Sequence, residues 1–204
     1  MTSTAPLTAG PLQLRAAEIE AAVARTAGRF SEVPVVETSI LRLLTLMGRE
    51  ISALLEQLLR PHGLNETDFR ILMCLFSQPD GVAHPSELCA YVAQSPANMT
   101  RVADGLCARG LVTRVASEED RRRTIIRITA AGETLARSLL PDTTALTRAI
   151  FAGMPQPACR ALLEQLRAII AQIDRQTQHC ASASCGAAEP AAHAAAVDQA
   201  GCGR

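Results

Sequence analysis

Apolar residues recur at helical spacing over most of the chain, which predicts a mainly helical protein. The first such stretch runs from Leu12 to Phe30, after a lead that contains Thr and Pro. Its pattern is typical of an amphipathic helix that needs a partner surface. Because the region around Pro34 breaks this helix, we assign residues 1–38 to a partly helical N-terminal arm.

The widest apolar stripe predicts a long helix from about Ser39 to Leu59. Ser39 is a residue type that caps helix N-termini, and Pro61 and Gly63 mark the end of the helix. The stripe is broader than one neighbouring helix requires, so we expect it to face both its own domain and a second subunit. It consists of Ile40, Leu43, Leu44, Met47, Ile51, Leu54, Leu55 and Leu58.

Three shorter helices follow in close succession. Asn65, with Asp68 three residues later, predicts the capped start of the first one. A short second helix opens at Pro85, and a third begins after Ser95 and ends at Gly110. The expected buried face of the first of these helices is Phe69, Leu72, Met73 and Phe76.

The period of the pattern then changes from helix to strand. Residues 111–116 and 124–129 are short and rich in β-branched side chains, and the polar stretch SEEDRRR separates them. This pattern predicts a β-hairpin with a charged tip. Helical spacing resumes over about 131–151 and 156–178. Large apolar residues almost disappear after that, so we expect 179–204 to form a disordered tail.

The order of these elements indicates the fold class, which is mainly α with a small β-hairpin. Three helices followed by a charged hairpin form the layout of a winged helix-turn-helix DNA-binding lobe. We place this lobe at about residues 64–129, within a domain that spans 39–178. The helices at about 39–60 and 131–178 are expected to form a helical dimerisation region.

The helix at 97–109 has an apolar face and an opposite face made of small residues. A small face lets the helix backbone lie deep in the major groove, where Asn, Thr and Arg reach base edges or phosphates. An ordinary solvent-exposed face is the alternative interpretation. The small face and its flanks contain Ala97, Asn98, Thr100, Arg101, Asp104, Gly105 and Ala108, and Ser95 lies at the cap.

Arginines gather at the hairpin tip, where Arg121, Arg122 and Arg123 are consecutive, and Arg114 lies on a flanking strand. An arginine-tipped wing can enter a narrow minor groove, although a solvated charge run is the alternative. The wing and the small helix face together predict a DNA-binding surface. Because Asp104 would repel phosphates if it were unpaired, we predict an Asp104–Arg122 ion pair.

Composition narrows the class of protein. The chain has 204 residues and zero formal net charge, so only the placement of its arginines argues for DNA. The sequence shows no secretory signal, no apolar run long enough to span a membrane, and no disulfide framework among its seven cysteines. We therefore expect a cytoplasmic protein without membrane association. It has no phosphate loop or nucleophile elbow, so we predict no enzymatic activity and no cofactor.

Three stretches of the chain resemble regulators of the MarR family. They are LNETDFRIL (64–72), NMTRVADGLCARGLVTR (98–114) and SEEDRRRTIIRITAAGE (117–133). The resemblance covers about residues 39–175 and is closest to the EmrR-like branch, whose members repress multidrug efflux pumps. It implies a homodimeric transcriptional repressor that binds a pseudo-palindromic operator in double-stranded DNA.

The same resemblance implies that small lipophilic or aromatic ligands relieve repression. Such ligands would bind between the dimerisation helices and the DNA-binding lobe. Candidate lining residues are Met47, Ile51, Phe69, Met73 and Phe76, and plain core packing is the alternative for all five.

A thiol- or metal-responsive regulator is the second functional hypothesis. It would act through the tail, which contains Cys180, Cys185, Cys202 and two histidines. Their spacing matches no zinc motif, so no metal site is predicted. Cys74 and Cys107 lie on predicted buried faces and are expected to be unreactive.

Overall fold

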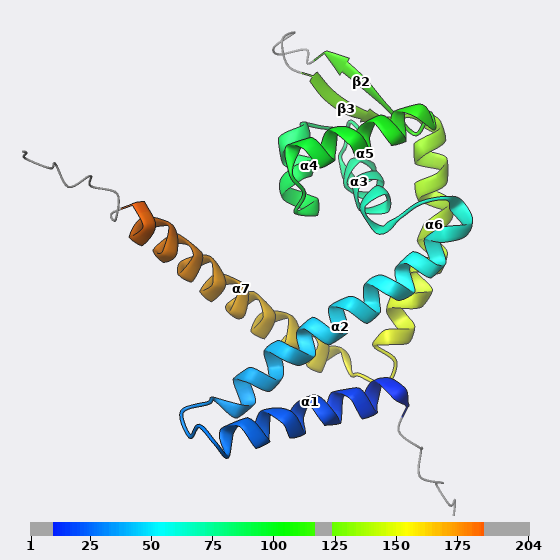
Figure 1. Cartoon of the computed structure of the whole chain (residues 1–204). Helices are drawn as coiled ribbons and strands as arrows, with labels where there is room; N and C mark the ends of the chain where they lie inside the picture. Colours follow the sequence, from blue (N-terminus) through cyan, green and yellow to red (C-terminus); the bar gives the residue numbers. More distant parts are fainter. Residues whose placement is uncertain (1–9, 117–123, 186–204) are drawn as a thin grey trace, which may run out of the picture. The chain divides into compact units, whose positions relative to one another are not determined.

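The structure is a computed structural model that describes residues 10–116 and 124–185, excluding the side chains of 180–185. The chain divides into two units, residues 1–148 and 149–204. The elements, labelled in Figure 1 where space allows, are α1 (Pro11–Ala27), α2 (Val35–Leu59), the 3₁₀ helix η1 (Arg60–His62), α3 (Glu66–Ser77), β1 (Val82–Ala83), α4 (Pro85–Val92), α5 (Pro96–Ala108), β2 (Val112–Ala116), β3 (Thr124–Ile128), α6 (Ala130–Ile150) and α7 (Gln156–Cys185).

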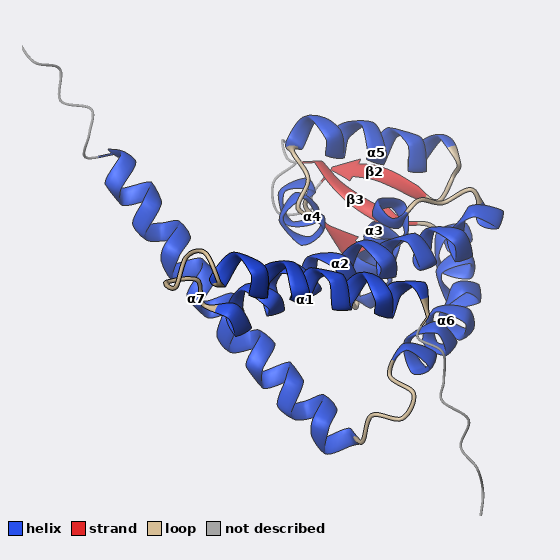
Figure 2. Ribbon diagram, turned by 60° about the horizontal axis from the view of Figure 1, so that its bottom comes forward, coloured by secondary structure: helices blue, strands red, loops and turns tan. Residues whose placement is uncertain are grey.

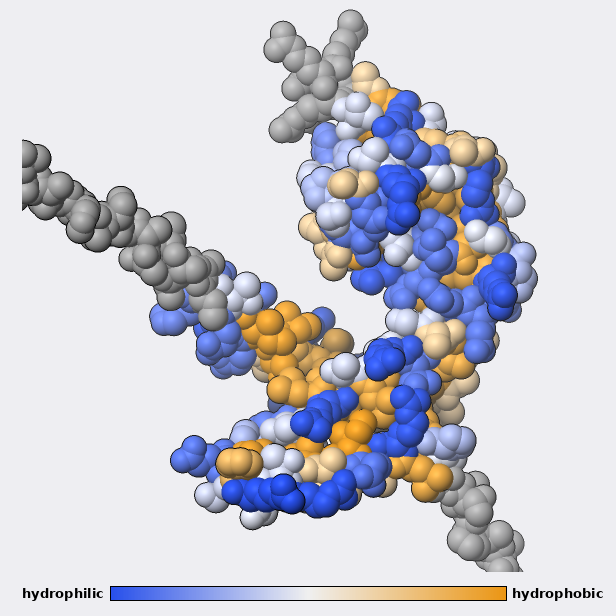
Figure 3. All heavy atoms as spheres, in the orientation of Figure 1, coloured by the Kyte–Doolittle hydropathy of each residue, from blue (hydrophilic) through white to orange (hydrophobic). Residues whose placement is uncertain are grey.

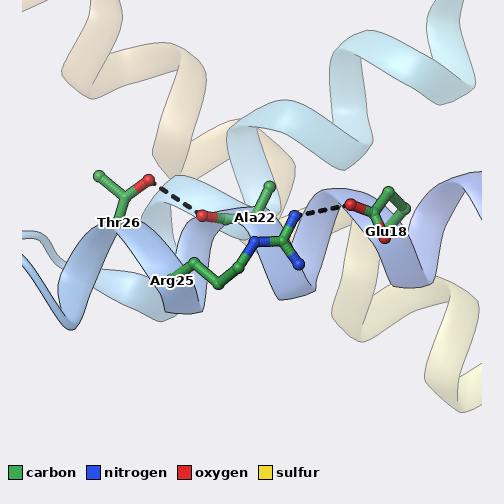
Figure 4. Close-up of polar contacts among 4 residues, drawn as sticks. All are labelled: Glu18, Ala22, Arg25 and Thr26. Carbon is green, nitrogen blue, oxygen red and sulfur yellow. Dashed lines mark hydrogen bonds and ion pairs between the residues drawn. The ribbon is translucent and has the colours of Figure 1, made fainter.

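The predicted helical arm is confirmed as α1, which packs against α2. Val23 is the buried residue of α1, and an ion pair of 2.7 Å from Arg15 Nη1 to Glu50 Oε1 joins the two helices. Arg25 also bonds Glu18 within α1, and the Thr26 hydroxyl donates to the carbonyl of Ala22 one turn earlier (Figure 4). The arm therefore has a partner surface in its own chain.

The prediction that Ser39 caps the long helix is wrong, because α2 begins at Val35. Pro34 lies at the N-cap, and its carbonyl accepts a hydrogen bond of 2.9 Å from the Thr38 amide. Proline is tolerated before the first turn because the N–H that it lacks has no helical partner there. Pro34 is thus the N-cap residue, and α2 begins at the next residue.

The capped start of α3 is confirmed, since the Asn65 side chain accepts from the Asp68 amide at 2.9 Å and Asp68 accepts from the Asn65 amide. The predicted buried face is only partly right. Leu72 is buried, whereas Phe69, Met73 and Phe76 are half-buried. Residues 69–76 are apolar except for Arg70, so spacing alone could not select the buried side. The residues fully enclosed on α3 are Ile71, Leu72, Cys74 and Leu75.

The predicted hairpin is confirmed as β2 and β3, but β3 also pairs with a third strand that the sequence did not predict. This strand, β1, is two residues long, too short to show an alternating pattern. Gly81 precedes it at a φ of 66°, a left-handed conformation that favours glycine. Its carbonyl accepts from the Ile128 amide at 2.9 Å. The sheet is antiparallel, in the order β1–β3–β2, and lies beside α4 and α5 (Figure 2).

One apolar core joins the helices and strands of this lobe and fixes the position of α5. It includes side chains that are at most 1% exposed from six different elements. Burying each one contributes about 1.5–3 kcal/mol relative to exposure. These six are Leu59, Leu72, Leu88, Leu106, Ile126 and Leu139.

The start of α6 meets the end of α5 at a close backbone contact. The Thr129 hydroxyl accepts a hydrogen bond from the Gly132 amide at 3.1 Å and donates to the Gly110 carbonyl at 2.7 Å. A Cβ added at Gly132 would lie 2.1 Å from the Leu111 carbonyl oxygen. Glycine is therefore required at this position of the ITAAG motif.

The second unit contains α7, which continues to Cys185 rather than ending near residue 178. The added stretch, residues 179–185, contains neither proline nor glycine, so no strong helix breaker interrupts the helix there. From 156 to 179 no residue of α7 is buried. Its exposed apolar side chains include Leu162, Leu163, Ile170 and Ile173, and hydrophobic residues cover much of its visible surface (Figure 3). Within the described residues, the helices are all too short or too polar to cross a membrane.

Candidate nucleic-acid interface

The rotation of α5 is set by its apolar side, where Met99, Ala103 and Leu106 are buried. Its start is fixed by Ser95, whose hydroxyl accepts from the Asn98 amide at 3.3 Å. These contacts confirm the predicted cap and leave the small face toward solvent. The exposed residues on that face are Ala97, Thr100, Arg101, Asp104, Gly105 and Ala108.

A chain of hydrogen bonds runs along the N-terminal half of this face. The Asn98 amide nitrogen donates to Gln94 Oε1 at 2.5 Å, and the Asn98 carbonyl oxygen accepts from Arg101 Nη2 at 2.8 Å. Gln94 and Asn98 are half-buried, whereas Arg101 is exposed. The Arg101 guanidinium is thus held at one edge and open to solvent elsewhere.

Arg114 connects the strand β2 to α5. Its guanidinium lies 2.7 Å from the Asp104 carboxylate and donates to the carbonyl of Thr100 at 3.3 Å. The Asp104 carboxylate is thus paired with an arginine of the wing strand, Arg114. The predicted Asp104–Arg122 pair stays a prediction, because Arg121, Arg122 and Arg123 lie outside the described residues.

A cavity of about 580 Å³ lies between α4, α5 and the strands of the hairpin. Its wall is mainly apolar, with Pro85, Met99 and Ile126 among its residues. Thr100 and Arg114 also line it and supply polar groups. Because Arg114 also binds Asp104, a molecule in this cavity would contact the residue that connects the wing to α5.

The five residues predicted to line a ligand site do not line this cavity. Met47 and Ile51 are 46% and 43% exposed on α2. Phe69 and Phe76 are packed against the core, and Met73 is half-buried. The Phe76 ring also lies 5.3 Å from the guanidinium carbon of Arg137. Their part in ligand binding stays a prediction.

Sequence reasoning missed two residues that position α5. Arg109 donates to the carbonyl oxygens of Gly63 at 2.7 Å and His62 at 2.9 Å, which ties the end of α5 to the loop after α2. Its partners are distant in sequence, so no local pattern indicates them. Gln94 could have been found from its spacing of four residues to Asn98 across the cap.

Two groups of this lobe have raised pKa values. Burial raises the pKa of Asp68, against the opposing effects of the Asn65 amide and the Arg109 charge. Burial, together with the nearby Glu87 charge, raises the pKa of the Cys74 thiol. A thiol that resists ionisation is a poor nucleophile, which agrees with the predicted inertness of Cys74. Cys107 is half-buried rather than buried.

Comparison with known proteins identifies this arrangement. Residues 62–123 match the MarR family. The transcriptional repressor MprA of Escherichia coli K12 is 29% identical over 152 residues, which are 74% of this chain and 86% of that protein. The structure of AbsC, a MarR family transcriptional regulator from Streptomyces coelicolor, matches with a TM-score of 0.62 and 26% identity, over 69% of this chain and 95% of that one. Residues 62–123 therefore carry a MarR family domain, and the fold matches that of MarR family regulators.

A second solved structure is similar to this chain. CouR from Rhodococcus jostii RHA1, bound to p-coumaroyl-CoA, matches with a TM-score of 0.59 and 25% identity, over 64% of this chain and 90% of that one. The sequence relatives are named as regulators or repressors of transcription. The protein is accordingly a transcriptional regulator with a winged helix-turn-helix lobe.

Proposed function

We propose that the protein is a homodimeric repressor that binds a pseudo-palindromic operator with α5 in the major groove and the hairpin tip in the minor groove. The observation that carries this proposal is the exposed, small face of α5, with Arg101 on it and Arg114 linking it to the wing strand. Small side chains permit close approach, and Arg supplies donors for base edges and phosphates. The similar protein MprA is named a transcriptional repressor, which supports repression rather than activation.

The direct test is selection of a binding site from a randomised duplex library, followed by binding measurements on the selected duplex. We expect Arg101→Ala to weaken binding by about 1–3 kcal/mol if Arg101 makes a base contact. An equal loss on random DNA would assign Arg101 to phosphate instead. Arg122→Ala should also reduce affinity at physiological salt, and unchanged affinity would reject the role of the wing.

Homodimerisation is supported by apolar side chains that a single copy leaves exposed. No described side chain of α7 is buried, and exposed apolar residues also lie on α2. Large exposed apolar patches on proteins commonly mark interaction surfaces. Two copies would present two α5 helices to successive major grooves of one operator.

We further propose that a small aromatic or lipophilic ligand relieves repression. CouR binds an aromatic acyl-CoA, and the cavity beside α5 offers an apolar wall with the Arg114 guanidinium. A ligand that engages Arg114 would compete with Asp104 and loosen the wing. The predicted set Met47, Ile51, Phe69, Met73 and Phe76 is the second candidate site. If the ligand binds in the cavity beside α5, Ala103→Leu should fill part of that cavity and prevent relief of repression. If it binds at the second candidate site, Met73→Ala should change the ligand concentration needed for relief.

The motifs shared with the EmrR-like branch support efflux-pump genes as targets. Deleting the gene for this protein should raise the transcript levels of the efflux-pump genes. Adding lipophilic drugs to wild-type cells should raise the same transcript levels. A thiol- or metal-responsive regulator is the alternative. Truncation after residue 178 distinguishes the two, since a drug-responsive repressor keeps its response and a tail sensor loses it.

A further inference from the structure

The side-chain amide of Asn98 is occupied at both ends. Its nitrogen donates to Gln94 Oε1 at 2.5 Å, and its oxygen accepts from Arg101 Nη2 at 2.8 Å. These two contacts fix which end of the amide points toward Arg101, because a flipped amide would direct its donors at a guanidinium that can only donate. Asn98 is also half-buried, whereas its neighbours on the small face are exposed.

An asparagine reads adenine by offering its amide oxygen and nitrogen together to one base edge. In Asn98 one N–H and one oxygen lone pair already bind protein, so the two contacts fix the orientation of the amide and leave one donor and one acceptor. Arg101 uses one Nη for Asn98 and keeps its remaining donors toward solvent. A guanidinium matches the two acceptors, O6 and N7, that guanine presents in the major groove.

Gln94 anchors the series of hydrogen bonds that runs from Gln94 through Asn98 to Arg101. Its backbone amide donates to the carbonyl of Cys89 at 3.0 Å, in the turn that closes α4. The preceding residue, Ala93, has a left-handed φ of 52°, which makes the turn between α4 and α5 tight. The Gln94 side chain is half-buried and lines the wall of the cavity between these helices. The anchor is therefore part of the rigid turn rather than of the exposed face.

We propose that Gln94 is a positioning residue for operator recognition: acting through Asn98, it directs the Arg101 guanidinium so that Arg101 reads a guanine. This inference rests on the proposed DNA-binding function. It adds a residue outside the DNA-contacting surface and assigns the reading of the guanine to Arg101. The expected ligand is a guanine edge in the major groove.

The test uses the full-length protein and the duplex that it selects from a randomised library. Replacing each guanine of the site in turn by 7-deazaguanine removes the N7 acceptor and leaves base pairing intact. We expect one such replacement per half-site to weaken wild-type binding by about 10-fold or more. Arg101→Ala should abolish the preference for guanine over 7-deazaguanine at that position.

Gln94→Leu should lose most of the same preference while its affinity for random duplex stays unchanged. Gln94→Glu is the matched control, because its carboxylate still accepts from Asn98. Its added charge should lower the affinity for the guanine duplex and for the 7-deazaguanine duplex equally. The ratio of these two affinities (the guanine ratio) should therefore stay near the wild-type value. In an Asn98→Ala background, Gln94→Leu should have no further effect on the ratio. Thermal unfolding of each variant checks that the lobe is intact.

Two results would overturn the inference. One is a Gln94→Leu protein that is folded and keeps the wild-type guanine ratio. The other is a folded Asn98→Ala protein that keeps the wild-type preference for guanine over 7-deazaguanine, because Gln94 is proposed to act through Asn98. A wild-type protein that selects no duplex at all would instead contradict the proposed function.

Discussion

Arg114 has the clearest structural role among the residues of the proposed DNA-binding surface. It joins β2 to α5 through the Asp104 carboxylate and the Thr100 carbonyl. The ion pair is exposed, so its own contribution to stability is about 0.2–1 kcal/mol. Its importance lies in connecting the wing strand to the helix, and in pairing an acidic group on the surface that we propose to face DNA phosphates.

Replacing Arg114 by Ala should therefore reduce DNA affinity much more than stability. The unfolding free energy should fall by less than about 1 kcal/mol, while binding to the selected duplex weakens because Asp104 becomes an unpaired negative charge. Arg167→Ala is the control, since Arg167 is also exposed and ion-paired, to Glu164 on α7. Fluorescence anisotropy and chemical denaturation measure the two quantities. Equal DNA binding by both variants would reject this role for Arg114.

Asp68 gives a prediction of pH dependence. Burial raises its pKa in the folded lobe above the ordinary value of 3.8. The folded state therefore holds this proton at a pH where the unfolded state has released it, and stability falls as the pH rises from 3.8 through the raised pKa. Asp68→Asn can retain a carbonyl acceptor in the cap and removes this titration, so its stability relative to wild type should increase over that range.

Denaturation curves between mildly acidic and neutral pH test this expectation. Glu66→Gln is the control for removal of a carboxylate, since Glu66 lies in the same first turn of α3. A stability difference between Asp68→Asn and wild type that stays constant with pH would show that burial of Asp68 does not control the effect.

At the scale of the elements, the caps of α3 and α5 and the hairpin followed from the sequence because they depend on local chemistry, whereas the start of α2 and the end of α7 did not. Ser95 and Asn65 cap helices as expected, and β2 and β3 match the predicted hairpin. The strand β1 and the buried side of α3 did not follow, because each depends on contacts with distant residues. The same holds for Arg109, whose partners His62 and Gly63 precede it by more than forty residues.

Gly132 offers a sharp test of the packing between elements. A Cβ there would overlap the Leu111 carbonyl oxygen at 2.1 Å and lie 2.8 Å from Ile128 Cγ1. Gly132→Ala should therefore lower the unfolding free energy by about 1–3 kcal/mol or more. Gly48→Ala, in the interior of α2, is the matched control because its Cβ meets nothing within 4 Å.

The control should gain about 0.5–1 kcal/mol, since alanine favours helix over glycine. Thermal and urea denaturation of the two variants measure this contrast. A Gly132→Ala protein as stable as wild type would show that the contact between α6 and Leu111 relaxes at no cost.

At the scale of the whole molecule, the exposed apolar side chains of α7 argue for association of two copies. Ile170→Asp combined with Ile173→Asp places two charges within this apolar surface. We expect the double variant to dissociate into monomers, because a desolvated unpaired charge is costly. Ala168→Asp lies on the opposite side of the helix by its spacing and should leave a dimer. Sedimentation velocity distinguishes these states, and a dimeric double variant would exclude α7 from the interface.

The central claim is that two copies present their α5 faces to one duplex. Hydroxyl-radical footprinting of the wild-type protein on its selected duplex tests it most directly. The account predicts two protected segments, related by two-fold symmetry, with centres about one helical turn (~10 bp) apart. A single protected segment, or protection no stronger than on random DNA, would contradict it.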